Sequence, residues 1–329
     1  MATQETTSTT TRRTLIRPEA RQTILAFAGL ILIFLVFFVA SPYFRKFDNI
    51  VAILLSTAVN GVLALGVTFV IITGGIDLSI GTILTFSAVM TGVFVVDLGL
   101  PVPIGVVLGL LSGALCGLVN GFVIAKMKVP PFIATLGMMM MTKGLALILS
   151  HSKPIYFADR PAFRQIAMGN IIPGVNIPTA VVILFLAAIV AALILGKTIL
   201  GRYNFAIGSN EEATRLSGVN VDAWKMAIYT LCGLFAGLAG VLMASRLDSA
   251  QPALGAGYEL DAIAAVVIGG TSLSGGEGTI LGTIIGAFIM STLINGLRIM
   301  SVPQEWQMVV TGVIVIGAVY LDIRRRHAK

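Results

Sequence analysis

Charged residues are scarce in this sequence. Asp, Glu, Lys and Arg make up only 11% of its 329 residues, whereas 57% are hydrophobic, and the mean hydropathy is +0.97. A soluble domain typically carries about 25% charged residues, so a protein this apolar has too few polar groups to cover its surface in water. The composition therefore excludes an ordinary soluble protein and predicts that membrane lipid surrounds most of the chain.

Residue types that carry metal or nucleophilic chemistry are scarce as well. The two cysteines, Cys116 and Cys232, lie inside apolar runs, and the two histidines, His151 and His327, are far apart. This pattern offers no metal-ligand spacing and no disulfide framework, so we expect both cysteines to pack as small apolar side chains. The His-Glu-x-x-His and Gly-x-Ser-x-Gly motifs are also missing, which argues against a metal site and against an intramembrane hydrolase.

A phosphate-binding loop is missing too. The pattern Gly-x-x-x-x-Gly-Lys-Ser/Thr, whose backbone amides cradle nucleotide phosphates, does not occur, since Gly196-Lys197-Thr198 lacks the upstream glycine. We therefore expect this chain to bind no cofactor, to hydrolyse no ATP alone and to have no enzyme activity.

Long apolar runs fill most of the chain instead. A helix needs about 20 apolar residues to cross a bilayer, and the runs predict an all-α membrane protein of about ten spans in a single domain, 23–322. We expect a disordered cytoplasmic tail over 1–22 and a basic cytoplasmic tail over 323–329. The predicted spans are 23–40, 51–72, 79–96, 102–125, 132–150, 179–196, 223–245, 258–270, 278–297 and 305–322, of which 258–270 is short.

The distribution of positive charge indicates an orientation. If the N-terminus is cytoplasmic, the Lys and Arg residues of the connections fall on the cytoplasmic side about twice as often as on the outer side, as the positive-inside rule requires. The sequence therefore predicts that both termini are cytoplasmic. The net charge of +7 follows from the same asymmetry, and we expect no nucleic-acid partner.

Two glycine-rich breaks between apolar runs resemble each other. Residues 72–79 contain Thr-Gly-Gly and lead into Gly-Thr-Ile-Leu, and residues 269–274 begin Gly-Gly-Thr and lead into Gly-Thr-Ile-Leu again. Paired breaks of this kind point to the substrate region of a transporter. They predict two related halves. The spacing of the breaks implies a parallel offset of six helices, while the number of spans suits a five-plus-five inverted arrangement equally well.

The polar stretch 197–225 contains a short predicted helix. Ser209 and Glu212 have the spacing of a capping box, and Gly218 is a suitable stop. A helix of about eight residues is unstable alone in water, so we expect it to dock on a partner; the alternative is a helix that lies on the protein's own surface. Its small apolar edge consists of Ala213, Leu216 and Val219.

Three long runs carry a family resemblance: ITGGIDLSIG, EEATRLSGVNV and SAQPALGAGYELDAIAAVVIGGTSLSGGEGTILGTIIGA. They resemble the permease subunits of ribose-type ABC sugar importers, and the resemblance extends from about residue 45 to 322. It implies a fold like that of the vitamin B12 permease and a location in the bacterial cytoplasmic membrane. The implied function is import of a monosaccharide, ribose or a similar pentose or hexose.

The resemblance also implies partners. They are a second permease copy, a cytoplasmic ATP-binding subunit that holds the ATP, and a periplasmic or lipid-anchored sugar-binding protein. The short cytoplasmic helix then becomes the coupling helix that docks on the ATP-binding subunit. Its expected residues are Ser209, Asn210, Glu211, Glu212, Ala213, Arg215, Leu216, Ser217 and Gly218.

Polar residues inside the apolar runs are few. An acidic group at membrane depth is costly unless it is paired or hydrated. We interpret Asp77 first as a cap of the helix that starts near Ser79, with a pathway-facing role as the alternative. Each polar candidate below fits a helix–helix hydrogen bond equally well. The candidate pathway residues are Asn60, Gly74, Gly75, Asp77, Ser79, Asn120, Thr135, Gly269, Gly270, Asn295 and Gln307.

An ion-coupled secondary transporter of a small polar solute is the competing hypothesis. That class usually carries several intramembrane charges for proton or sodium coupling. The predicted spans contain almost none, which favours a permease that depends on a separate ATPase.

Overall fold

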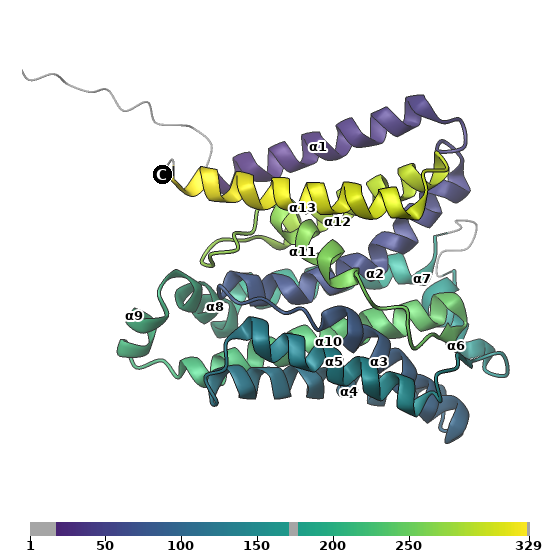
Figure 1. Ribbon diagram of the computed structural model, residues 1–329, viewed down its shortest axis with the longest axis horizontal. Coiled ribbons are helices and arrows are strands. Elements are labelled where there is room, and N and C mark those ends of the chain that lie inside the picture. Colours follow the sequence, from purple (N-terminus) through teal and green to yellow (C-terminus); the bar gives the residue numbers. More distant parts are fainter. Residues whose placement is uncertain (1–17, 171–176, 328–329) are drawn as a thin grey trace, which may run out of the picture.

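The computed structural model describes residues 18–170 and 177–327. Thirteen α-helices, a short π-helical turn and two short strands make up this part of the chain, which confirms the predicted all-α class (Figure 1). The helices are α1 (Pro18–Ala40), α2 (Phe47–Ile72), α3 (Ile80–Gly92), α4 (Val102–Ala125), α5 (Pro131–Leu149), α6 (Pro161–Met168), α7 (Thr179–Lys197), α8 (Ile199–Ser209), α9 (Glu211–Leu216), α10 (Val221–Leu247), α11 (Tyr258–Ile268), α12 (Ile280–Ile299) and α13 (Gln304–His327), with the π-helical turn η1 (Val93–Asp97) and the strands β1 (Ile155–Tyr156) and β2 (Ser249–Ala250).

The predicted tails differ from the structure at their inner ends. Residues 1–17 lie outside the described part, but α1 begins at Pro18, so 18–22 are helical rather than disordered. Proline suits the first turn of a helix because it lacks an N–H that would find no helical partner there. At the other end α13 continues to His327, because basic side chains favour the last turn of a helix.

Eight helices in the described residues are long and apolar enough to cross a membrane: α1, α2, α3 with η1, α4, α5, α7, α10 and α12. The chain is therefore a multi-pass membrane protein. The eighth predicted span, 258–270, which is short in the sequence, forms the 11-residue α11, about half of what a bilayer requires. The tenth predicted span lies within the 24 residues of α13.

The helices form layers around a buried centre. α1, α12 and α13 lie on one side of α2 and α11, while α3, α4, α5 and α10 lie on the other (Figure 1). Burial follows this order: one apolar 18-residue stretch of each helix is 72% buried in α2 and 67% buried in α10, but only 6% buried in α1. Large apolar side chains such as Leu32, Val39, Ile148 and Ile316 are exposed on the outer helices, as expected of a surface that faces lipid.

Glycines let α4 and α10 approach closely. A methyl group added at Gly113 would lie 2.5 Å from the carbonyl oxygen of Gly233 and 3.0 Å from the Cα of Gly237. The glycines of α4 and α10 therefore face each other across this helix pair, which is the usual device for close packing in membranes. Cys116 and Cys232 are both buried and free, as predicted.

The two ends of the bundle differ. One end, called the α9 end below, carries α8, α9 and the C-terminal end of α13 (Figure 1). The opposite end carries α6 and the β1–β2 pair, in which Ile155 pairs antiparallel with Ala250. Ser245 holds α6 there, because its hydroxyl donates to the carbonyl of Phe163 (2.7 Å) and accepts from the amide of Ala167 (2.9 Å).

Candidate functional site

The predicted short helix exists as α9, but its cap differs from the prediction. Asn210 is the N-cap: its backbone is extended and its side-chain oxygen accepts from the amide of Ala213 at 2.9 Å. Ser209 ends α8 instead, so the predicted capping box of Ser209 and Glu212 is wrong, and the helix has six residues. Gly218 follows the helix with a φ of 84°, the left-handed conformation that a helix stop uses.

The two faces of α9 have different surroundings. Thr214 is buried on the side that faces the rest of the protein, whereas Leu216 is 83% exposed. Ala213 is exposed next to Leu216 on the outer side. The apolar edge of α9 therefore makes little contact with this chain and is free to meet another surface.

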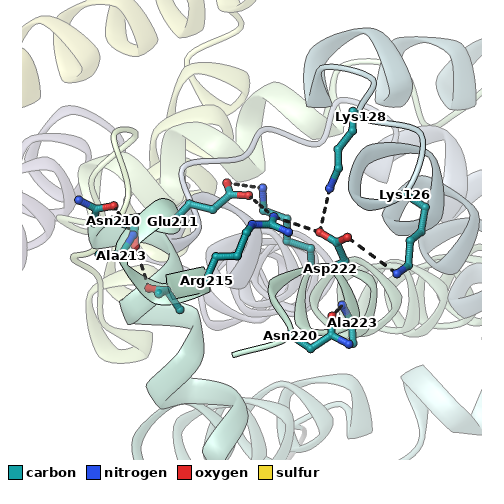
Figure 2. A network of polar contacts seen from close by, with 11 residues as sticks. Lys126, Lys128, Asn210, Glu211, Ala213, Arg215, Asn220, Asp222 and Ala223 are labelled. Carbon is teal, nitrogen blue, oxygen red and sulfur yellow. Dashed lines mark hydrogen bonds and ion pairs between the residues drawn. The ribbon is translucent and has the colours of Figure 1, made fainter. Parts of the chain in front are cut away.

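Ion pairs hold α9 to the rest of the α9 end (Figure 2). Glu211 accepts from Lys225 at 2.6 Å and pairs with Arg215 at 3.2 Å. Arg215 reaches Asp222 at 3.1 Å, and Asp222 also pairs with Lys128 at 2.9 Å. These contacts join α9, the start of α10 and the turn between α4 and α5 in one network.

Two further residues show how the network is built. Lys126 lies 3.8 Å from Asp222, so this carboxylate faces three cations with a side chain that is only 16% exposed. Asn220 caps α10 by accepting from the amide of Ala223 at 3.1 Å, which fixes the first turn that carries Asp222 (Figure 2). Isolated surface ion pairs contribute little, but a shared, half-buried network holds its members in one geometry.

The ion pairs of α9 shift the pKa values of Glu211 and Arg215. Burial would raise the pKa of the Glu211 carboxyl, but the Lys225 ammonium and then the Arg215 guanidinium outweigh it and leave the pKa below its usual range. Hydrogen bonds to Asp222 and Glu211 raise the pKa of Arg215. Glu211 and Arg215 therefore stay ionised at neutral pH.

Sequence reasoning missed this network. Arg215 was expected among the docking residues, but the structure engages it inside the chain, while Glu212 is exposed and makes no ion pair with the described residues. Asp222 and Lys128 are 94 positions apart. No local spacing links them, so no pattern in the sequence could have found the contact.

Three candidate pathway residues form one buried chain of hydrogen bonds. One oxygen of Asp77 accepts from the amide of Ser79 at 2.9 Å and from its hydroxyl at 2.5 Å. Asn120 donates its amide to the Ser79 hydroxyl at 2.9 Å. Asp77 is fully buried, and no Lys or Arg of the described residues pairs with it. Its bond to the amide two residues on organises the turn before α3. The N-cap of α3 is Ser79, and no side chain caps that helix, so the expected role of Asp77 as the cap is corrected to ordering the preceding turn.

The glycines of the two breaks are restricted by backbone geometry. Gly74 and Gly270 have φ values of 76° and 96°, which side chains disfavour. A methyl group at Gly75 would lie 2.6 Å from the Tyr229 hydroxyl, and one at Gly269 would overlap the backbone of Gly282. Both breaks therefore require glycine where the sequence has it.

The remaining candidates are scattered. Thr135 donates to the carbonyl of Pro131 and Gln307 to that of Val302, each at 2.8 Å. Asn60 is buried with an unpaired side-chain oxygen, and Asn295 has one too. Among the described residues, no hydrogen bond joins these four to Asp77, Ser79 or Asn120.

The structure is that of a multi-pass helical membrane protein with a short, ion-paired helix at one end. Residues 49–319 match the family described as the branched-chain amino acid transport system / permease component, and the chain belongs to that family. It is therefore a transport permease component and not an enzyme, which confirms both the predicted resemblance and the predicted class.

Named relatives cover almost the whole chain. It is 43% identical over 290 residues to "Ribose import permease protein RbsC" of Escherichia coli (strain K12), with 87% of this chain and 89% of that protein covered. It is 42% identical over 300 residues to the RbsC of Bacillus subtilis (strain 168), with 91% and 92% covered. The "L-arabinose transport system permease protein AraH" of Escherichia coli (strain K12) is 39% identical over 305 residues, with 92% of each covered. No solved structure matches the chain significantly.

Proposed function

We propose that this chain is the permease subunit of an ABC importer that carries a monosaccharide, ribose or a similar pentose or hexose, across the bacterial cytoplasmic membrane. The sugar class rests on the relatives, whose names specify ribose and L-arabinose import. The observation that carries the dependence on an ATPase is α9, whose most apolar side chain, Leu216, is 83% exposed on a helix that ion pairs hold in place.

The α9 end is the cytoplasmic end in this proposal. A cytoplasmic ATP-binding subunit binds the ATP and docks on α9, and both termini lie on the same side of the membrane. A sugar-binding protein meets the end that carries α6 and β1–β2. A second permease copy completes the transporter. The positive-inside rule supports this orientation.

A fold like that of the vitamin B12 permease, with ten crossings, is part of the same proposal. Here α11 makes only half a crossing, and the irregular residues 251–257 that follow β2 make the other half. Irregular backbone at membrane depth is tolerated where protein buries it or water reaches it. Its close packing on α3 supports this, because a methyl group at Gly255 would overlap the backbone of Gly81.

Reconstitution in liposomes tests the proposal. The purified chain alone should hydrolyse no ATP, because the sequence lacks a phosphate-binding loop. With the ATP-binding subunit and the binding protein added, hydrolysis should rise with ribose or L-arabinose in the binding protein, and the same sugar should enter the liposomes. Uptake that an ion gradient drives without the ATP-binding subunit would overturn the proposal in favour of a secondary transporter.

A further inference from the structure

Three chain segments meet through backbone atoms at the α9 end. They are the end of α2, the end of α8 and the loop 269–279, which contains the second glycine-rich break. The amide of Gly276 donates to the carbonyl of Ile72 at 2.9 Å. Gly208 lies against the same pair: a methyl group there would overlap the Ile72 carbonyl and come within 2.6 Å of the Gly276 nitrogen. The two breaks that resemble each other in sequence are therefore in direct contact.

Glycine is required on the α8 side and on the loop side of this junction. Gly275 and Gly276 have φ values of 85° and 76°, which favour glycine. A methyl group at Gly275 would lie 2.8 Å from the carbonyl oxygen of Gly208 and 2.8 Å from the amide nitrogen of Gly74. One at Gly276 would lie 2.8 Å from the hydroxyl of Ser209. At Gly208 and Gly275 the three nearest atoms that an added methyl group would meet are all backbone atoms, which cannot rotate away as a flexible side chain can.

The junction is directly connected to α9. Gly208 is the second-last residue of α8, and only Asn210 separates α8 from α9. A displacement of α9 therefore acts on Gly208 over very few bonds. Close-packed interiors transmit such displacements because they compress little, so the movement reaches Ile72 and Gly276 together.

Each contacted segment leads into a helix of the buried centre. Ile72 precedes the turn that holds Asp77 and Ser79 and then starts α3. The loop 269–279 ends in Thr279, whose hydroxyl caps α12 by accepting from the amide of Gly282 at 3.1 Å. A displacement of Gly208 would therefore act on the segments that lead into both α3 and α12.

We propose that Gly208 is a positioning residue that joins α9 to both glycine-rich breaks, so that movement of a docked ATP-binding subunit reaches both breaks through one backbone junction. This inference rests on the proposed docking of that subunit at α9.

The test compares Gly208→Ala with Gly196→Ala in the reconstituted transporter. Gly196 lies near the end of α7, and a methyl group there meets nothing within 4 Å. We expect both variants to insert and to co-purify with the ATP-binding subunit. Gly208→Ala should continue to hydrolyse ATP, while its sugar uptake per ATP falls about tenfold, within the range that coupling mutations produce. Gly196→Ala should match the unmodified protein.

A second pair keeps the test decisive if Gly208→Ala fails to insert. Gly276→Ala and Gly99→Ala introduce the same methyl group at similar positive φ values, 76° and 66°, but space around Gly99 is open. Only Gly276→Ala should lose uptake per ATP. Normal uptake per ATP in Gly276→Ala, or in an inserted Gly208→Ala, would overturn the junction. Co-purification of the ATP-binding subunit is a separate readout. If this subunit still co-purifies normally with Leu216→Asp, the proposed docking on α9 is refuted instead.

Discussion

Replacing Leu216 by aspartate tests the docking surface most directly. Leu216 is 83% exposed in the isolated chain, so a partner that covers α9 would bury nearly the whole side chain. Burying a leucine is worth roughly 1.5–3 kcal/mol, and each 1.4 kcal/mol changes a dissociation constant about tenfold. Leu216→Asp should therefore weaken binding of the ATP-binding subunit by about ten- to a hundredfold, with a further loss because a carboxylate is buried.

The fold should tolerate the same substitution. The side chain of Leu216 makes little contact inside the chain, and the ion pairs of Glu211 and Arg215 do not involve it. Expression, membrane insertion and detergent-solubilised size should stay unchanged. Co-purification of the ATP-binding subunit with tagged permease measures docking, and sugar uptake in cells measures the consequence.

Glu212→Ala is the matched control, because Glu212 is exposed on the same short helix and makes no ion pair within the described chain. An exposed charge contributes less than about 1 kcal/mol to a contact, so this variant should lose at most about fivefold in binding. Normal binding and normal uptake in Leu216→Asp would refute the reasoning. The docking site would then move to the turn at 126–131, which shares the network through Lys128.

Other perturbations test the remaining assignments. Gly75→Leu should reduce uptake more than Asp77→Asn, because a side chain at Gly75 meets the Tyr229 hydroxyl while an asparagine at position 77 still accepts from the Ser79 amide; the opposite order would make Asp77 a direct participant in transport. Reporter fusions at Lys153 and Asn210 should report the outer and the cytoplasmic side respectively, and a common side would contradict the orientation. Burial raises the pKa of Glu211, but Lys225 and Arg215 lower it by more, so the pKa is lowered overall. A carboxyl group whose pKa is lowered in the folded state stabilises that state above the unfolded-state pKa. This stabilisation is lost as the pH falls through the folded-state pKa. Hydrogen exchange of the α9 amides, corrected for intrinsic rates, should therefore be constant between about pH 6 and 8 and accelerate below about pH 4; a change within the neutral range would contradict the ion pairs.

The sequence predicted those features that depend on local pattern. Runs of apolar residues identified the long helices, and Gly218 marked the stop of α9 because only the local backbone conformation matters there. The cap of the same helix was misplaced by one residue, because Ser209 and Asn210 are both residue types that cap helices well. The pattern of apolar residues marked 258–270 as short, and the helix there has 11 residues.

Contacts between distant segments could not be predicted. Asp222 meets Lys128 across 94 positions, and Ile72 accepts from Gly276 across an even longer stretch. Such contacts depend on how the helices are arranged, and one sequence does not determine this. The Asp77 turn was predictable because the aspartate bonds to an amide only two residues on.

The position of α1 has a consequence for how related sequences diverge. Few described residues of this helix are buried, and it packs on α12 through a small apolar cluster that includes Ala26 and Ile285. Fluid lipid imposes no specific packing on an apolar side chain that faces it. Most substitutions among Leu, Ile, Val and Phe in α1 should therefore leave stability and transport unchanged. Residues on α2 or α10 must fit neighbours and should change slowly. The family match begins at residue 49, after α1 has ended.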